Sequence, residues 1–194
     1  GFSLDDPYII VTFHPVTLEN NTAGQQIENL LNALDNFNEY RIIFTKANAD
    51  TDGRIINRKI DQYVKLNSGR TKVFTSLGMV RYLSALKYCE LVIGNSSSGI
   101  IEAPSLGIPT VNIGNRQLGR VRAESVIDCG DSAEEIMESI RKAKRIRKEG
   151  KINRFISPYE KEGTSMKILS EIQKYLLQDR PEMKKFCDIQ FNTV

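Results

Sequence analysis

The sequence predicts an α/β fold in which helices cover both faces of a parallel β-sheet. Short apolar runs rich in β-branched residues alternate with longer segments in which apolar residues recur at helical spacing. The alternation continues from Tyr8 to about Cys129, which is typical of repeated strand–helix–strand units. Because ligands bind at the carboxyl ends of the strands in such sheets, we expect a functional site at those ends.

Six segments have the length and apolar content of strands, and turn residues bound them. They are residues 8–13, 41–45, 71–74, 91–93, 110–113 and 125–128. Helices are expected between and after them, where apolar side chains recur three and four positions apart. The first helix is marked by Ile27, Leu30, Leu31 and Leu34, and the second by Ile55, Ile56, Ile60, Tyr63 and Val64. In the third helix, the residues expected to face inward are Val80, Leu83 and Leu86. Residues 48–53 are expected to form a turn before the second helix.

A capping-box pattern marks the start of the helix after the last strand, because Glu135 follows Ser132 by three residues. The residues expected on the inner face of this helix are Ile136, Met137 and Ile140. A final helix is expected over about residues 164–178. The sequence predicts no structure for the tail, residues 179–194.

The composition is that of an ordinary soluble globular protein. The chain has 194 residues, of which 40% are hydrophobic and 26% charged, and its net charge is +3. This charge is too small to indicate nucleic acid as a partner, and no apolar run approaches the roughly 20 residues of a membrane span. We therefore expect neither nucleic acid nor a membrane as a partner.

The cysteine pattern indicates a reduced compartment. Cys89, Cys129 and Cys187 are far apart and odd in number, and they have no metal-ligand spacing. We expect a cytoplasmic protein without a signal peptide, a metal or a cofactor. The chain begins at Gly1 without Met and reaches its first strand within eight residues, which indicates a piece of a longer protein.

Residues 141–151, RKAKRIRKEGK, form a basic run at the end of a predicted helix. Cations near a helix C-terminus are favoured by the helix dipole, and such a run is usually a solvated face. Nucleic-acid binding is the weaker alternative for this segment.

The most informative segment is residues 91–117, which reads as strand, Ser/Gly turn, helix and strand. The helix is expected to begin at about Ser97 and to end near Gly107. Backbone N–H groups at a helix N-terminus are unpaired, and the helix dipole adds partial positive charge there. Because Ser96 and its two neighbouring serines would add hydroxyl donors, this turn is a candidate phosphate cradle. The alternative is that Ser96 only caps the helix.

Two charged residues could complete a nucleotide site around this turn. Glu102 lies six residues after Ser96, too far to be the carboxylate of a capping box. It would repel an adjacent phosphate, but it could accept hydrogen bonds from ribose hydroxyls one sugar away. Arg116 follows the next strand and could close over a diphosphate. The alternative for Glu102 is a solvated side chain.

Plausible ligand groups follow four different predicted strands: His14, Asn48, the pair Ser96 and Ser97, and Arg116. Because the carboxyl ends of parallel strands meet at one edge of a sheet, the four together favour a binding site more than any one of them alone. His14 is the only histidine, and an imidazole can donate or accept a proton near neutral pH. A lone histidine is more commonly an ordinary loop residue.

Three motifs resemble the UDP-N-acetylglucosamine 2-epimerase family: VTFHPVT at 11–17, the Asn-Ala-Asp turn at 48–50, and GNSSSGIIEAPSLGIPTVNIGNRQ at 94–117. The likeness covers about residues 8–170. His14 is followed by Pro-Val-Thr rather than by the basic run of the non-hydrolysing branch. The chain is therefore more similar to the hydrolysing branch, which makes N-acetylmannosamine for sialic acid synthesis. The alternatives are the non-hydrolysing branch and the donor-binding domain of another GT-B glycosyltransferase.

The resemblance implies a GT-B fold, in which a UDP-sugar lies between two Rossmann-like halves. The chain would be the C-terminal half, with residues 1–194 forming a single UDP-binding domain. Ser96 and Ser97 would bind the diphosphate, Glu102 the ribose hydroxyls and Arg116 the phosphate region.

The resemblance also implies roles for three more residues. Asn48 would lie near the nucleotide, Leu77 would offer backbone groups to the uracil, and His14 would have a catalytic role beside the diphosphate and the reacting sugar. The implied reaction is elimination of UDP from UDP-N-acetylglucosamine, followed by hydration to N-acetylmannosamine. The carboxylates for proton transfer would lie in the N-terminal half, so the chain alone is expected to be inactive. The parent enzyme is expected to be a homo-oligomer.

Overall fold

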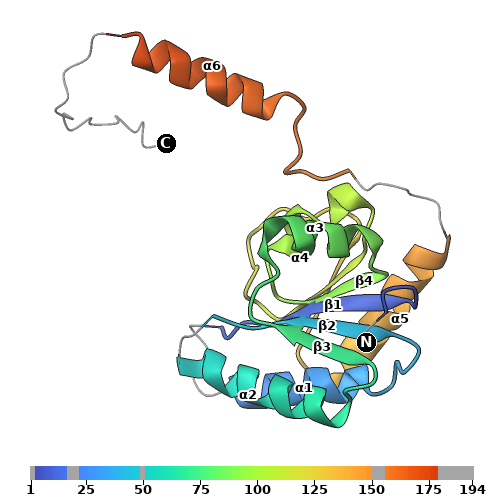
Figure 1. Ribbon diagram of the computed structural model, residues 1–194. Helices are drawn as coiled ribbons and strands as arrows, with labels where there is room; N and C mark the ends of the chain where they lie inside the picture. The colour runs from blue at the N-terminus through green and yellow to red at the C-terminus, as the bar shows by residue number, and fades with distance from the viewer. Residues whose placement is uncertain (1–2, 17–21, 49–50, 150–155, 179–194) are drawn as a thin grey trace, which may run out of the picture. The chain divides into compact units, whose positions relative to one another are not determined.

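The computed structural model describes residues 3–16, 22–48, 51–149 and 156–178 (Figure 1). The chain divides into two compact units, residues 1–160 and 161–194. The first unit contains a six-stranded sheet, and the described part of the second contains one helix.

The sheet of the first unit is parallel throughout, as the sequence predicts. Its strands are β1 (Tyr8–Thr12), β2 (Arg41–Thr45), β3 (Thr71–Phe74), β4 (Leu91–Gly94), β5 (Thr110–Ile113) and β6 (Val126–Cys129). They lie in the order β3-β2-β1-β4-β5-β6. The chain leaves β1 toward one edge of the sheet and β4 toward the other, so a crevice is expected between the carboxyl ends of these two strands.

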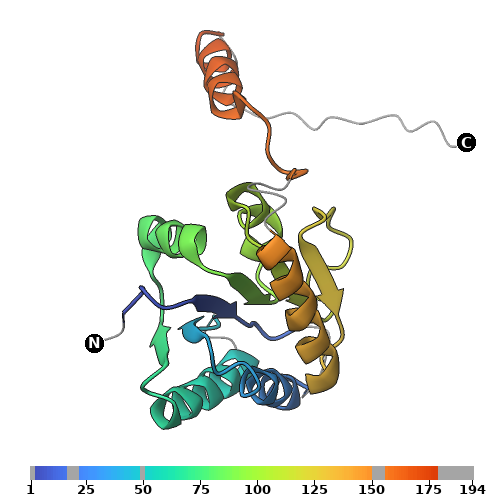
Figure 2. The ribbon, with the colours of Figure 1, turned by 90° about the vertical axis from the view of Figure 1, so that its right-hand side faces the viewer.

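Helices cover both faces of this sheet (Figures 1 and 2). They are α1 (Ala23–Leu34), α2 (Thr51–Leu66), α3 (Gly78–Tyr88), α4 (Ser98–Ile101), the 3₁₀ turn η1 (Pro104–Leu106) and α5 (Ala133–Glu149). Helices α1, α2 and α5 share one hydrophobic core with Ile9 and Val11 of β1. Tyr8 and Ile10 of the same strand pack on the opposite face with residues of α3 and of the segment after α4. Both faces of β1 are therefore covered, and all five of its residues are buried, which explains its run of apolar residues from Tyr8 to Val11.

Local sequence signals account for most of the helices. The four apolar residues whose spacing predicts α1 are all buried. At the start of α5, the Ser132 hydroxyl accepts a hydrogen bond from the Glu135 backbone N–H at 3.3 Å and donates to the Glu135 carboxylate at 2.6 Å. Ile136 and Ile140 of α5 are buried, as predicted, and Met137 packs against the core.

The inward face predicted for α3 is wrong at two of its three positions. Leu86 is fully buried, but Val80 is 73% exposed and Leu83 is 36% exposed. The helix instead presents Tyr82 and Ala85, together with Leu86, to the core. Residues 82, 85 and 86 also contain pairs three and four positions apart, so apolar periodicity could not separate this face from the one with residues 80, 83 and 86.

Two boundaries also differ from those predicted. The expected helix from Ser97 to Gly107 is a single α-helical turn followed by η1. Pro104 has no N–H to continue the α-helical ladder, and Gly107 ends the segment in the left-handed conformation, with φ of 74°. The expected turn at 48–53 is shorter, because α2 already begins at Thr51. Residues 49 and 50 lie outside the described part of the chain.

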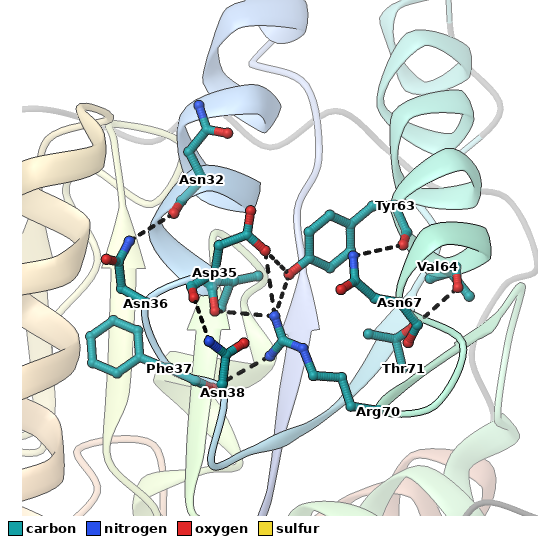
Figure 3. A network of polar contacts seen from close by, with 11 residues as sticks. Asn32, Asp35, Asn36, Phe37, Asn38, Tyr63, Val64, Asn67, Arg70 and Thr71 are labelled. Carbon is teal, nitrogen blue, oxygen red and sulfur yellow. Dashed lines mark hydrogen bonds and ion pairs between the residues drawn. The ribbon is translucent and has the colours of Figure 1, made fainter.

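A polar network joins α1, α2 and β3 at the edge of the sheet where the strands begin (Figure 3). Arg70 donates to the Tyr63 hydroxyl at 2.7 Å and lies 3.5 Å from the Asp35 carboxylate. It also donates to the carbonyls of Leu34 and Phe37, each at 3.4 Å, after the last turn of α1. Tyr63 in turn donates to Asp35 at 2.8 Å. Both carbonyls also accept backbone hydrogen bonds, from the N–H groups of Phe37 and Tyr40, so Arg70 adds a second donor to each of them.

The second unit contains α6 (Thr164–Leu176). Its apolar residues recur at helical spacing, but none of its residues is buried within the described part of the chain. Residues 179–194, the predicted tail, lie outside the described residues. None of the helices that the structure describes has the length and apolar character needed to cross a membrane.

Candidate functional site

A pocket of about 340 Å³ opens where β1, β2 and β4 end. The chain segments that follow these strands, together with the start of α3, form its wall. Its lining includes Thr12 and His14 after β1, Thr45 and Lys46 after β2, residues 75–79 and Tyr82 around the start of α3, and Ser96 and Ser98 after β4. The pocket therefore lies where the strand order predicts a crevice.

Asn95, which follows β4 and is fully buried, connects the segments around this pocket. Its side-chain Oδ1 accepts a hydrogen bond from the His14 backbone N–H, and its Nδ2 donates to the His14 carbonyl, both at 2.7 Å. Its backbone carbonyl accepts hydrogen bonds from Arg116 Nη1 at 3.1 Å and Gln117 Nε2 at 2.8 Å. The ends of β1, β4 and β5 are thus connected through one residue.

Gly94 lets β4 end in close contact with β1. Its φ of +133° is one that residues with a Cβ rarely adopt. A Cβ added at Gly94 would lie 2.0 Å from the Thr12 carbonyl oxygen. Glycine is therefore required at this point for the chain to turn into the serine-rich segment.

The serine turn presents hydrogen-bond donors without the long helix that the sequence predicts. Within the described residues, the backbone N–H groups of Ser96 and Ser97 donate to no protein acceptor. The Ser96 hydroxyl accepts from the Ser98 N–H at 3.4 Å. Because α4 is a single turn, its dipole is small, and an anion here would be held chiefly by local N–H and O–H donors.

Tyr82 of α3 is hydrogen-bonded to the serine turn. Its hydroxyl donates to the Ser98 hydroxyl oxygen at 2.8 Å. Burial, and to a smaller extent the charge of Glu102, raise the pKa of Tyr82, although its hydrogen bond to Ser98 acts in the opposite direction. Tyr82 therefore stays protonated at physiological pH and keeps donating to Ser98.

Glu102 is the residue after α4, and it has a free acceptor. Its Oε2 atom is buried and has no hydrogen-bond partner among the described residues. A buried carboxylate oxygen without a donor is costly to the fold, so such an atom suggests a donor supplied by a ligand.

The structure brings some of the predicted site residues into one pocket and leaves others outside it. His14, Leu77 and Ser96 line the same pocket. Ser97 is adjacent in the chain, while Glu102 and Arg116 flank the same strand end without lining this pocket. Asn48 is exposed and lies three residues after β2, next to residues outside the described part.

Sequence reasoning missed Asn95, Tyr82, Thr45 and Lys46. Thr45 and Lys46 end a predicted strand, so the strand-end argument that selected His14 could have found them. Tyr82 and Asn95 gave no comparable signal, because a helix position and a turn position do not by themselves indicate a site. Among the described residues, no group of three potential ligand side chains could hold a metal ion.

A family model described as UDP-N-acetylglucosamine 2-epimerase matches residues 3–173. The chain belongs to this family. It is 43% identical over 140 residues to the GDP/UDP-N,N'-diacetylbacillosamine 2-epimerase (hydrolyzing) of Campylobacter jejuni, covering 70% of this chain and 36% of that protein. It is 37% identical over 188 residues to the polysialic acid biosynthesis protein P7 of Escherichia coli, covering 96% of this chain and 48% of that protein.

Solved structures of the family share the fold. A UDP-GlcNAc 2-epimerase from Neisseria meningitidis bound to UDP-GlcNAc matches with a TM-score of 0.64 at 14% identity, over 87% of this chain and 45% of that one. A Listeria monocytogenes structure gives a TM-score of 0.64 at 16% identity, over 94% and 49%. The predicted family and the GT-B-type α/β fold are thus confirmed. The chain spans less than half the length of these relatives.

Proposed function

We propose that this chain is the C-terminal, UDP-binding half of a hydrolysing UDP-N-acetylglucosamine 2-epimerase. Two relatives, 43% and 32% identical, carry names that specify hydrolysing 2-epimerases. The observation that carries the proposal is the turn after β4. There the backbone N–H groups of Ser96 and Ser97 donate to no acceptor among the described residues, and Ser96 lines the same pocket as His14. These donors match the needs of a diphosphate leaving group.

In this proposal the nucleotide lies along the ends of β4 and β5. Ser96 and Ser97 bind the diphosphate, and Arg116 neutralises it from the loop after β5. Glu102 accepts hydrogen bonds from the ribose hydroxyls through its unpaired oxygen. Leu77 and Asn48, from the segments after β3 and β2, contribute toward the uracil end of the nucleotide.

The proposed reaction is an elimination followed by a hydration. A base removes the C2 proton of the sugar, a C1–C2 double bond forms, and the bond between C1 and the UDP oxygen breaks. Water then adds across the double bond, with hydroxyl at C1 and a proton at C2 on the face opposite to the one that lost it, so the product is N-acetylmannosamine. His14 contacts the diphosphate and the reacting sugar, and hydrogen bonds to the leaving oxygens stabilise their developing charge.

Among the described residues, the pocket wall contains no carboxylate that could remove the C2 proton. We propose that the remainder of the parent protein supplies this base. This agrees with the match covering only 36% and 48% of the C. jejuni and E. coli relatives.

One other substrate and two other reactions are compatible with the same nucleotide site. The names of two relatives favour UDP-N,N'-diacetylbacillosamine as an alternative substrate. A non-hydrolysing epimerase or a glycosyltransferase would use the same donor site without releasing a free 2-epimerised sugar. Product analysis on the full-length parent protein separates these functions, because free N-acetylmannosamine together with UDP is expected only for the proposed one.

Titration calorimetry with UDP tests the binding function on the 194-residue chain. We expect saturable binding that Ser97→Ala weakens by about 1–3 kcal/mol, because a hydrogen bond to a charged group is lost. Ser105→Ala is a matched control, since Ser105 lies in η1 away from the turn. A folded chain that binds no UDP at millimolar concentration would contradict the proposal.

A further inference from the structure

We infer that Asn95 is a positioning residue, whose side-chain amide fixes His14 and whose carbonyl fixes Arg116 in the geometry that the nucleotide site requires. The inference rests on the proposed function for the identity of the ligand, but the contacts that carry it are present in the unliganded chain.

The side chain of Asn95 continues the pairing of β1 with β4 beyond the end of the strands. The parallel ladder ends with Thr12 opposite Gly94, and the Asn95 N–H still donates to the Thr12 carbonyl at 3.1 Å. Beyond that point, the Asn95 carboxamide bonds to both backbone groups of His14 at 2.7 Å. An amide side chain presents a donor and an acceptor as a peptide group does, so it replaces the neighbouring strand for His14.

The backbone of His14 is constrained from both directions. Pro15 restricts the preceding residue to extended conformations, which suits the paired geometry. The two hydrogen bonds from Asn95 then fix where the His14 backbone lies relative to β4. The imidazole therefore starts from a defined point on the pocket wall.

The carbonyl of Asn95 performs the same task for the loop after β5. It accepts hydrogen bonds from Arg116 and from Gln117, which is itself buried. His14 and Arg116, the proposed catalytic and phosphate-binding residues, are thus located relative to each other through one fully buried residue. Misplacement of reacting groups by about 1 Å can cost about 100-fold in rate, so such a residue matters although it touches no substrate.

The contacts require an amide in particular. An ionised carboxyl at this position could accept from the His14 N–H, but it could not donate to the His14 carbonyl and would repel it. A protonated carboxyl has one donor and one acceptor and would restore both bonds. The Asn95→Asp variant is therefore a pH-dependent disruption of this one contact.

The single histidine of the chain provides a direct readout. We expect the Cε1–Hε1 signal of His14 in NMR spectra of the 194-residue chain to move and broaden in Asn95→Asp and Asn95→Ala. UDP affinity, measured by calorimetry, is expected to fall roughly 10-fold or more in both. The difference between Asn95→Asp and wild type at equal pH should shrink under acidic conditions, as the introduced carboxyl becomes protonated. A purely structural role would not produce this recovery at His14.

Asn112→Ala is the matched control. Asn112 is a buried asparagine on the adjacent strand β5, and its Nδ2 donates to Asp128 at 2.6 Å. Its loss should reduce stability comparably while leaving the His14 signal and UDP affinity unchanged.

The inference is overturned if folded Asn95 variants show the His14 signal of the wild type, or if Asn112→Ala shifts that signal equally. If Asn95→Ala does not fold, Asn95→Asp compared at neutral and acidic pH decides the matter. Failure of the wild type to bind UDP would reject the proposed function, but the His14 signal would still test the role of Asn95.

Discussion

At the scale of single residues, Gly94 shows how little freedom the chain has where β4 ends. The site depends on β4 approaching β1 closely enough for Asn95 to reach the His14 backbone. Only a residue without a Cβ permits this approach, because a Cβ would lie 2.0 Å from the Thr12 carbonyl oxygen and 2.7 Å from its carbon. Both atoms belong to a central strand, so neither can shift cheaply.

Gly94→Ala is therefore expected to destabilise the chain by about 3 kcal/mol or more, since the clash adds to the cost of a strained φ. Urea unfolding followed by circular dichroism measures the change. Gly69→Ala is the control, because a Cβ there would meet nothing within 4 Å. Equal stability of the two variants would show that β1 and β4 can separate at this point without cost.

Glu102 should behave in opposite ways in the free and the nucleotide-bound chain. Its Oε2 is buried without a partner among the described residues, so Glu102→Gln removes a costly charge from the free fold. We expect unchanged or slightly raised stability in urea, together with UDP binding weakened by about 1–3 kcal/mol in calorimetry. Glu124→Gln, at an exposed position, should change neither. Loss of stability without loss of UDP affinity would assign Glu102 to the fold alone.

The residues that sequence reasoning could and could not find differ in the kind of contact they make. His14 and Ser96 were predicted because each follows an apolar run, and the structure brings them to one pocket. Asn95 was read as part of a turn. Its partner is the backbone of a residue 81 positions away, and a side-chain-to-backbone contact leaves no periodicity in the sequence.

At the scale of elements, strands were predicted better than helix faces. The six strands were found to within one residue. Burial on both faces makes the central strands β1 and β4 mostly apolar, whereas the edge strands β3 and β6 are only partly buried. Helix α3 carries two sets of apolar residues at helical spacing, and the set with Tyr82 and Ala85 is the one that packs against the core. The length of helix α4 was overestimated because the apolar pattern continues through Pro104. The α-helical hydrogen-bond ladder cannot continue there, since proline has no N–H.

The network that joins α1, α2 and β3 gives an alkaline pH dependence of stability. Burial, and then its hydrogen bond to Asp35, raise the pKa of Tyr63 above the ordinary value of about 10, although the nearby Arg70 acts in the opposite direction. The unfolded chain therefore loses this proton at lower pH than the folded chain does. The stability contributed by the neutral tyrosine is fully present below about pH 10 and is lost as the pH rises through the folded pKa.

Tyr63→Phe is expected to lower stability by about 1–2 kcal/mol at pH 8, because Asp35 and Arg70 each lose a hydrogen bond. The difference between wild type and variant should narrow above pH 10, where the wild type loses its advantage. Urea unfolding at pH 8 and pH 10.5 measures both effects. Tyr159→Phe, at an exposed position, should match the wild type at each pH. A constant difference between wild type and Tyr63→Phe would contradict the assignment.

At the scale of the whole molecule, the strand order determines where the site lies. The sheet places β1 and β4 side by side at its centre, so residues far apart in sequence end at one crevice. Alternating strands and helices predict a parallel sheet and a site at the carboxyl ends of its strands. They do not specify which strand ends are adjacent. The structure shows that β2 neighbours β1 and that Asn48, three residues beyond the end of β2, is exposed, so its predicted place near the nucleotide stays a prediction.

The composition of the pocket wall predicts that the chain alone is inactive. The match covers 36% of the C. jejuni relative and 48% of the E. coli relative, and the pocket wall in the described residues offers phosphate-side donors without a carboxylate base. We expect the 194-residue chain to bind UDP yet to release no UDP from UDP-N-acetylglucosamine above the uncatalysed level.

The full-length parent protein should release UDP and N-acetylmannosamine together, as followed by proton NMR of the sugar. His14→Ala in that protein should remove most of this activity. Running the assay in parallel with UDP-N,N'-diacetylbacillosamine identifies the preferred sugar. Turnover by the chain alone would mean that a base within its own residues abstracts the C2 proton. Asp52, in the first turn of α2, would then be the first residue to substitute.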